Sequence, residues 1–350
     1  MVPPKVSVIL PVWNGEQYLR QTLDSILGQD FPELEVVIVD DGSSDGTAQI
    51  LSLYSGDTRI RLFRQTNKGL VAALNKGLEL ATAEFIARID ADDLMIPSRL
   101  TAQFSYLREN PDVLAVGSFI ELIDGKGRKI GLRAFPAGKV KVTETMRRYC
   151  TLAHPAVMAR KSALLAAGGY RECFRHAEDY DLWLRLIEMG PVDNIPEPLT
   201  KYRIHEKSVT HLHRVEQGLS TLAAQLAYRR RKAGLGDPFL TLTKAVTYDD
   251  IDALEIPAVD QSDFVVIRFA LLSEESTDTT KLVSALAWSW TLRKYLHSGR
   301  YVRHCIVPAT ATLLKAGEYR LAFSWYANAM FTAPLSCCWM TLKLLITRSG

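Results

Sequence analysis

Apolar runs of strand length alternate with helical patterns through the first half of this 350-residue chain, and no other feature constrains its fold as strongly. The runs are bounded by polar turns and fall at Val6–Leu10, Val36–Val39, Arg59–Phe63, Phe85–Ile89 and Val113–Ile120. Between them, apolar residues recur at the three- and four-residue steps of an amphipathic helix. The first such helix is expected after an N-cap at Asn14. This order predicts an open, largely parallel α/β sheet with helices on both faces, in which ligands bind at the carboxyl ends of the strands.

The length and the change of pattern along the chain predict one large domain with a smaller appendage. Beyond Thr210 the strand pattern fades and long helical patterns take over. We therefore expect an α/β domain over residues 1–210 and an α-helical region of helical hairpins over residues 211–350. The stretch from Gly125 to Arg148 carries eight Lys or Arg against the single acid Glu144, and we expect it to be a mobile connection.

Charge and cysteine content narrow the class of protein. Lys and Arg number 42 against 39 Asp and Glu, a net charge of +3, so we expect no nucleic-acid partner. The five cysteines show no metal-ligand spacing, which favours free thiols in a reducing compartment. The first apolar run, Val6–Leu10, is too short for a signal-peptide core. A cytoplasmic protein is expected.

One segment, Leu321–Leu342, requires a membrane test because it contains no charged residue. Pro334 and several polar residues interrupt it, so we do not expect it to span a bilayer. The basic runs Lys126–Arg148 and Arg229–Lys232 can be solvated surfaces, or can hold the protein against the anionic inner face of the cell membrane. Both interpretations stay open, so peripheral membrane contact is a further hypothesis.

Carboxylates at the predicted strand ends are the informative chemical feature. Asp40 and Asp41 end the second strand, and Asp90, Asp92 and Asp93 end the fourth. If those strands are neighbours, five carboxylates meet in one crevice, which is costly unless a cation compensates their charge. Mg²⁺ or Mn²⁺ suits such a site, with one or two carboxylates and the phosphates of a substrate as ligands. Capping of the following helices is the alternative role, and we favour it for Asp40 but not for the second group.

The turn after the first strand excludes two common nucleotide-binding modes. Residues Pro11–Glu16 lack both the dinucleotide-binding and the P-loop glycine patterns. A nucleotide would therefore have to be held by the acidic turns and a metal ion. The same absence argues against a nucleotidyltransferase, which would carry a glycine-rich basic loop at this point.

A series of short segments follows in a fixed order between residues 6 and 205. They are Val6–Asn14, Val39–Thr47, Asn67–Gly69, Asp90–Asp93, His154–Pro155, Gly168–Tyr170, Glu178–Trp183 and Tyr202–His205. Each is weak alone, but the ordered set resembles the family 2 glycosyltransferases. The chain departs from that pattern at Leu74, where many members carry an arginine.

The resemblance implies a GT-A fold, a Rossmann-like open mixed sheet flanked by helices. It also implies metal-dependent, inverting transfer of a sugar from a nucleotide-diphosphate donor, UDP-linked, to a hydroxyl of a glycan or lipid-linked acceptor in cell-surface polysaccharide synthesis. The residues it implies are Pro11, Trp13, Asp41 and Asp90 for the nucleotide-sugar, Asp92 and His205 for Mn²⁺ or Mg²⁺, Asp179 for the catalytic base, and Glu178 and Trp183 for the acceptor region.

Two alternatives remain beside this interpretation. Glu178 and Asp179 begin a helical pattern and could serve only as partners of the helix dipole. The chain could also be a non-catalytic nucleotide- or glycan-binding module that keeps the fold. His154 can be a satisfied loop histidine or a ligand, and His176 is left open as an acceptor contact.

Overall fold

The computed structural model describes residues 3–205, 214–252 and 254. These residues belong to two compact units. The first comprises Met1–Leu212 with Thr241–Ala245, and the second comprises His213–Leu240 with Val246–Gly350.

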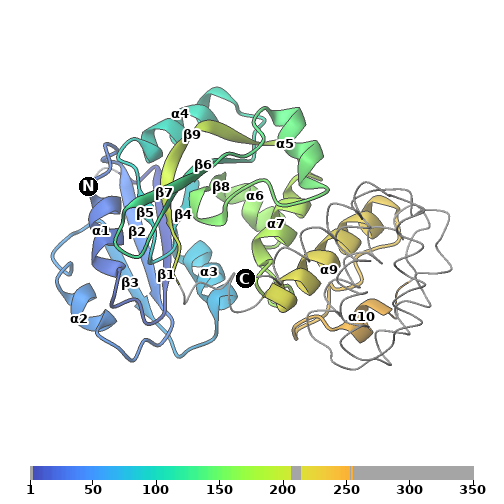
Figure 1. Ribbon diagram of the computed structural model, residues 1–350, viewed down its shortest axis with the longest axis horizontal. Helices are drawn as coiled ribbons and strands as arrows, with labels where there is room; N and C mark the ends of the chain where they lie inside the picture. Colours follow the sequence, from blue (N-terminus) through green and yellow to red (C-terminus); the bar gives the residue numbers. More distant parts are fainter. Residues whose placement is uncertain (1–2, 206–213, 253, 255–350) are drawn as a thin grey trace, which may run out of the picture. The chain divides into compact units, whose positions relative to one another are not determined.

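The first unit is a mixed α/β fold built on a sheet of nine strands among the described residues (Figure 1). Its elements are β1 (Val6–Val12), α1 (Leu19–Leu27), β2 (Leu34–Asp40), α2 (Thr47–Ser52), β3 (Ile60–Arg64), α3 (Leu70–Leu80), β4 (Phe85–Arg88), β5 (Leu94–Met95), α4 (Arg99–Glu109), β6 (Ala115–Ile123), β7 (Lys129–Arg133), α5 (Lys139–Met146), a 3₁₀ turn (His154–Ala156), β8 (Met158–Arg160), α6 (Lys161–Ala166), α7 (Glu178–Leu186) and β9 (Val192–Arg203).

The strand order is β3-β2-β1-β4-β8-β6-β9-β5, with β7 paired to β6 off this path. The first four strands are parallel, as the alternating pattern predicts. The rest of the sheet is mixed, because β8 runs antiparallel to β4 and to β6, and β5 antiparallel to β9. The expected open mixed sheet is confirmed, whereas the largely parallel sheet holds only for its first half.

Burial explains why β1 and β2 are almost continuously apolar. Every residue of both strands is buried, as expected when helices cover both faces of a parallel sheet. Leu19, Leu23 and Ile26 of α1 belong to the core on one face. On the other face α3 packs very closely, since a Cβ at Gly77 would lie 2.5 Å from Cγ2 of Ile9. α3 is thereby fixed beside the strand ends that carry the candidate site (Figure 1).

The strand order corrects the expected meeting of five carboxylates. β1 lies between β2 and β4, with Val12 opposite Asp40 and Ile9 opposite Arg88. The two acidic strand ends are therefore one strand apart. Among the described residues, the group of three or more acids close enough to share a cation is Asp90, Asp92 and Asp93.

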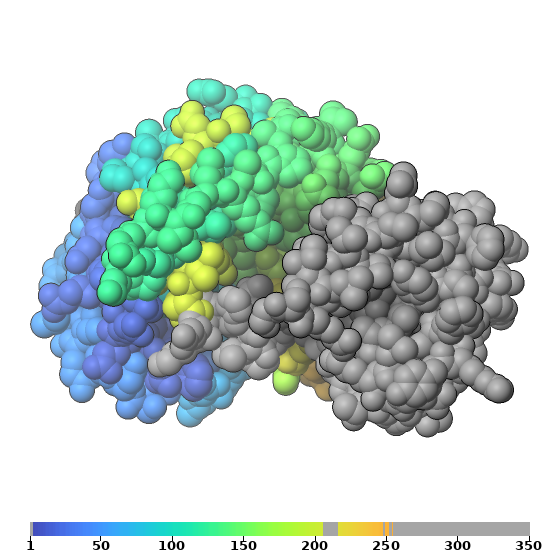
Figure 2. Space-filling model, viewed as in Figure 1, coloured from blue at the N-terminus to red at the C-terminus, as the bar shows by residue number. Residues whose placement is uncertain are grey.

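Two local expectations are also wrong. The first helix begins at Leu19 with Tyr18 as its N-cap residue, and Asn14 instead bonds across to the β2 turn. The basic stretch from Gly125 to Arg148 forms β7, which pairs with β6, and α5. Figure 2 shows residues of this stretch on the surface of the first unit. β7 is mostly exposed at the edge of the sheet, which explains why its sequence lacks the apolar run of a buried strand.

The second unit is helical in its described part. α9 (Arg214–Lys232) buries Leu222, Ala223, Leu226 and Ala227, and α10 (Tyr248–Asp252) follows. An ion pair of 2.7 Å joins Arg231 to Asp237 across the turn that ends α9. No helix among the described residues is long and apolar enough to cross a membrane. Leu321–Leu342 lies outside the described residues.

Candidate active site

Asp41 anchors one side of the site, at the end of β2. Its carboxylate is 4% exposed and accepts three hydrogen bonds of 2.8 Å, from Nε2 of Gln65 and from the main-chain N–H groups of Lys68 and Gly69. These bonds fix the turn that leads into α3. Because the Asp41 carboxylate is occupied by the protein itself, it shapes this corner by holding main chain in place.

Pro11 and Trp13 lie beside this corner at the end of β1. The main-chain N–H of Asp41 donates to the Val12 carbonyl at 2.8 Å, which brings the two strand ends together. Pro11 is buried, whereas the Trp13 side chain is 59% exposed and offers an aromatic surface to a ligand. Asp40 has a local role, since it accepts from the Ser43 N–H at 2.9 Å and pairs with Arg64 at 3.3 Å.

The acidic turn after β4 forms the centre of the site. One carboxylate oxygen from each of Asp90, Asp92 and Asp93 lies within 4.8 Å of the others. Asp90 is gripped by both terminal nitrogens of Arg88, at 2.6 and 2.5 Å, and Oδ2 of Asp92 lies 2.8 Å from Nε2 of His205. The structure thus brings His205 to Asp92, although they are 113 residues apart.

Asp93 is the buried member of the turn. Its Oδ1 accepts from the main-chain N–H of Arg203 at 2.8 Å, and its Oδ2 is buried with no hydrogen-bond partner in the described part of the chain. Burial, with the neighbouring charges of Asp92 and Asp90, raises the pKa of Asp93 well above its usual range. A concentration of negative charge of this kind favours a positive ligand.

Arg203, the last residue of β9, fastens this turn. Its guanidinium is 1% exposed and donates to the Asp92 carbonyl at 2.7 Å and to Oε1 of Gln21 at 2.9 Å. It also lies 4.4 Å from the ring centroid of Tyr18, whose ring in turn contacts His205 at 5.4 Å. The end of β9 therefore fixes both the acidic turn and the histidine beside it.

Glu178 and Asp179 occupy the first turn of α7, where the helix dipole favours acids. Burial raises the pKa of Asp179 to about 6, against the opposing effects of the Tyr180 N–H and the Arg88 charge. Burial and the Asp179 charge raise the pKa of Glu178 to about 8. Asp179 is thus ionised near neutral pH yet basic enough to accept a proton, whereas Glu178 holds its own. This arrangement can serve as a general base.

The aromatic residues near this helix are buried. Nε2 of His154 lies 3.0 Å from the Tyr170 hydroxyl, and burial lowers the pKa of His154, so that its imidazole is neutral. His154 therefore behaves as a satisfied histidine. Trp183 is 1% exposed and lies edge-on to the His154 ring, with centroids 6.0 Å apart. Any contribution of Trp183 to an acceptor region is therefore through packing. His176 adopts a positive φ of 62° just before α7.

Three polar residues that organise the site, Arg88, Arg203 and Asn75, received no role in the sequence-based prediction, although Arg203 lies within the Tyr202–His205 segment. Arg88 could have been recognised, because it is a charged residue within the buried strand β4 and stands two residues before Asp90. Arg203 and Asn75 bond mainly to main-chain groups far away in sequence, which no local pattern reveals. Leu74, where the chain departs from the expected family pattern, is buried in α3.

Comparisons with known proteins identify the family of this chain. The sequence model of "Glycosyl transferase family 2" matches residues 7–164. Putative glycosyltransferase EpsE of Bacillus subtilis (strain 168) is 38% identical over 206 residues, which cover 57% of this chain and 73% of EpsE. The chain belongs to glycosyl transferase family 2. This family 2 protein is also 34% identical over 208 residues to the O-antigen biosynthesis glycosyltransferase WbnJ of Escherichia coli, covering 58% of this chain and 81% of WbnJ.

The fold of this family 2 glycosyltransferase has counterparts among solved structures. The crystal structure of S. aureus TarS in complex with UDP-GlcNAc aligns with a TM-score of 0.54 and 18% identity, over 93% of this chain and 92% of that one. At this level of identity the likeness shows the fold alone. The expected GT-A type architecture is confirmed.

Proposed function

We propose that this enzyme transfers a sugar from a UDP-linked donor to a hydroxyl of a glycan or lipid-linked acceptor, with inversion and with the help of a divalent cation. The acidic turn, with Asp92 against His205 and the orphaned oxygen of Asp93, is the observation that carries the proposal. The names of two similar proteins add support, since WbnJ acts in O-antigen biosynthesis and the TarS structure holds UDP-GlcNAc. Cell-surface polysaccharide synthesis is the process we propose.

The nucleotide part of the donor is proposed to bind at the ends of β1 and β2. Trp13 supplies an exposed aromatic surface for the base, and Pro11 and Asp41 complete that corner. Asp90 is proposed to face the ribose. Arg88 supports this role, because its two-point grip fixes the orientation of the Asp90 carboxylate and offsets its charge.

The donor set of the acidic turn fits Mn²⁺ or Mg²⁺. Asp92 and His205 would hold the ion, and carboxylate oxygens close together with a buried orphan nearby favour a cation over water. The ion would act as a Lewis acid that stabilises the charge of the departing diphosphate. Arg203 keeps the Asp92 main chain and the approach of His205 in place.

Asp179 is proposed as the base that removes the proton of the acceptor hydroxyl. Its raised pKa suits this task, since an efficient general base has a pKa near the working pH. A single base opposite the leaving group is what an inverting displacement requires. Glu178, which holds its proton at neutral pH, can donate a hydrogen bond to the acceptor and is proposed to border its site.

We also propose the organisation and the place of the enzyme in the cell. Residues 1–210 would form the transferase domain and residues 211–350 an appended helical region. The proposed location is cytoplasmic, with peripheral contact to the inner face of the membrane. The basic end of α9, Arg229–Lys232, is the feature that supports this contact.

A thermal-shift panel tests the donor and the cation together. The purified protein would be heated with UDP-glucose, UDP-galactose, UDP-GlcNAc or GDP-mannose, each with Mn²⁺ or with EDTA. We expect stabilisation by UDP-sugars that requires the cation, because an ion held by Asp92 would offset the negative charge of the diphosphate. An Asp92→Asn variant should lose this stabilisation, whereas Asp112→Asn, an exposed acid paired with Lys139 on another part of the surface, should keep it. Stabilisation that persists in the presence of EDTA would exclude a role of the cation in donor binding.

A second assay separates the enzyme from a non-catalytic binding module. Release of UDP from the stabilising donor would be followed with Mn²⁺ present. Slow hydrolysis of the donor by water is expected from an enzyme, since Asp179 can deprotonate water as well as an acceptor. Binding without any UDP release in the presence of acceptor extracts would favour the non-catalytic alternative.

A further inference from the structure

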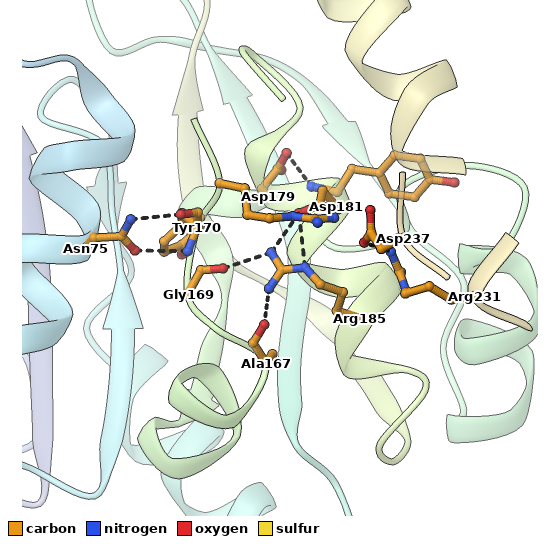
Figure 3. A network of polar contacts seen from close by, with 11 residues as sticks. Asn75, Ala167, Gly169, Tyr170, Asp179, Asp181, Arg185, Arg231 and Asp237 are labelled. Atoms are coloured by element: carbon orange, nitrogen blue, oxygen red, sulfur yellow. Dashed lines mark hydrogen bonds and ion pairs between the residues drawn. The ribbon is translucent and has the colours of Figure 1, made fainter. Parts of the chain in front are cut away.

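The Gly169–Tyr170 turn precedes α7, the helix that carries the proposed base, and a side chain of α3 hydrogen-bonds to this turn. Asn75 on α3 pairs its side-chain amide with the main chain of Tyr170, donating from Nδ2 to the Tyr170 carbonyl at 2.8 Å and accepting from the Tyr170 N–H at 2.9 Å (Figure 3). Gly169 has a φ of +67°, and a Cβ there would lie 2.7 Å from Oδ1 of Asn75. The close fit means that glycine is required for this amide to reach the turn.

A side chain of α7 also hydrogen-bonds to this turn. Arg185 donates from Nη2 to the Gly169 carbonyl at 2.8 Å and from Nη1 to the Ala167 carbonyl (Figure 3). The fully buried Asp181 binds Arg185 at 2.7 Å and also pairs with Arg171. Asp181 is two residues after Asp179, so the turn and the first turn of α7 form one bonded unit.

The turn also places an aromatic side chain among the site's charges. The Tyr170 ring is buried, and its hydroxyl meets His154. Burial raises the pKa of the Tyr170 phenol against the opposing charge of Arg88, and the charges of Asp179 and Glu178 raise it further. The turn is connected to the first turn of α7 through Arg185 and Asp181.

α3 connects this unit to the proposed nucleotide corner. Asp41 holds the N–H groups of Lys68 and Gly69, which lead into α3, and Asn75 lies on the second turn of the same helix. Hydrogen bonds to main chain at two points thus join the donor side to the base side through one rigid helix.

We propose that Asn75 is a positioning residue for sugar transfer, which acts through the Gly169–Tyr170 turn to fix the first turn of α7 and with it Asp179. The proposal rests on the assignment of Asp179 as the base. Asn75 touches neither donor nor acceptor in this scheme, so its loss should change the rate of the chemical step and leave donor binding intact.

The test compares Asn75→Ala with wild type and with a matched control. Asn110→Ala removes the same kind of bond, an asparagine Nδ2 donating to a tyrosine carbonyl at 2.9 Å, at the end of α4. UDP release from UDP-GlcNAc, UDP-glucose and UDP-galactose with Mn²⁺ would give kcat and KM. We expect kcat to fall about 100-fold in Asn75→Ala, since small misplacement of a catalytic group costs that much, with the donor KM unchanged. Asn110→Ala should match wild type.

Hydrogen–deuterium exchange gives a readout that does not depend on the donor. In Asn75→Ala, amides over residues 168–171 and 178–181 should exchange faster, and those at the start of β1 should not. If Asn75→Ala does not fold, Asn75→Asp keeps an acceptor for the Tyr170 N–H but cannot donate to its carbonyl, and the same pattern is expected. Faster exchange confined to 168–171 would overturn the proposal, as would a raised KM with unchanged kcat or an equal loss in Asn110→Ala.

Failure of the inference can be told from failure of the proposed function. If Asp179→Asn retains full UDP release, the base assignment fails. If Asp179→Asn is inactive while Asn75→Ala behaves as wild type, the positioning role alone fails.

Discussion

Replacing Asp179 by asparagine tests the proposed base with little change in shape. The substitution keeps an oxygen that can accept the Tyr180 N–H, which is bonded to Oδ1 at 2.7 Å, but removes the capacity to take a proton. General-base catalysis contributes about 10²- to 10⁴-fold to a rate, so transfer should fall by that amount. Donor binding should be nearly unchanged, because the nucleotide corner and the acidic turn lie on other elements.

The wild-type pH profile supplies the matching prediction. With a pKa of about 6, Asp179 is about one-tenth ionised at pH 5 and about nine-tenths ionised at pH 7. Since the base acts in its ionised form, kcat should rise about tenfold per pH unit below pH 6 and level off above it. This rise of kcat below pH 6 should be absent from the residual activity of Asp179→Asn.

The assay is UDP release at saturating donor between pH 4.5 and 8, with calorimetric UDP affinity measured on the same samples. Asp249→Asn, which removes an acid from the first turn of α10, is the control for a helix-dipole effect. Two results would refute the reasoning. One is a rise in kcat centred near pH 4, where an ordinary aspartate titrates. The other is an equal loss of UDP affinity and of transfer in Asp179→Asn.

Three more predictions concern Asp92, Arg203 and Glu178. Asp92→Asn should abolish the Mn²⁺-dependent part of UDP affinity in calorimetry, and unchanged affinity would remove Asp92 from the metal site. Arg203→Lys loses the Nε–H that donates to the Asp92 carbonyl, so Mn²⁺ affinity measured by electron paramagnetic resonance should fall about 10- to 100-fold, as for other groups that orient metal ligands. Without divalent cation, the unfolding temperature should fall as the pH rises from about 5 to 8 and then level off. The folded-state pKa of Glu178, about 8, lies above its unfolded value of 4.5, so its stabilising contribution is complete below pH 4.5 and is lost progressively as the pH rises to 8. Glu178→Gln should flatten that slope, and an unaltered slope would contradict the burial argument.

The sequence predicts those parts of the fold whose signal is local. β1 and β2 are apolar at nearly every position because both faces are covered, so their runs are unmistakable. β9 escapes the pattern because Pro196 and Pro198 interrupt it, and its register with β6 shifts at the same place. The order of strands is not local information, and the expected meeting of five carboxylates fails because β1 separates β2 from β4.

The same distinction applies to the site. Asp90 and Asp92 could be singled out because they end a strand, and acids at a strand end carry a chemical meaning without further context. The amide of Asn75 and the guanidinium of Arg203 could not, since their main-chain partners lie 95 and 111 residues away. Their roles follow only from which elements the tertiary fold brings together.

The central claim is that a divalent cation at the acidic turn supports transfer from a UDP-sugar. The most direct measurement is UDP release from the stabilising donor before EDTA, after EDTA, and after Mn²⁺ is added back, in wild type and in Asp92→Asn. The account predicts release that EDTA abolishes and Mn²⁺ restores in wild type, with neither effect in Asp92→Asn. Release that continues undiminished in EDTA would contradict it.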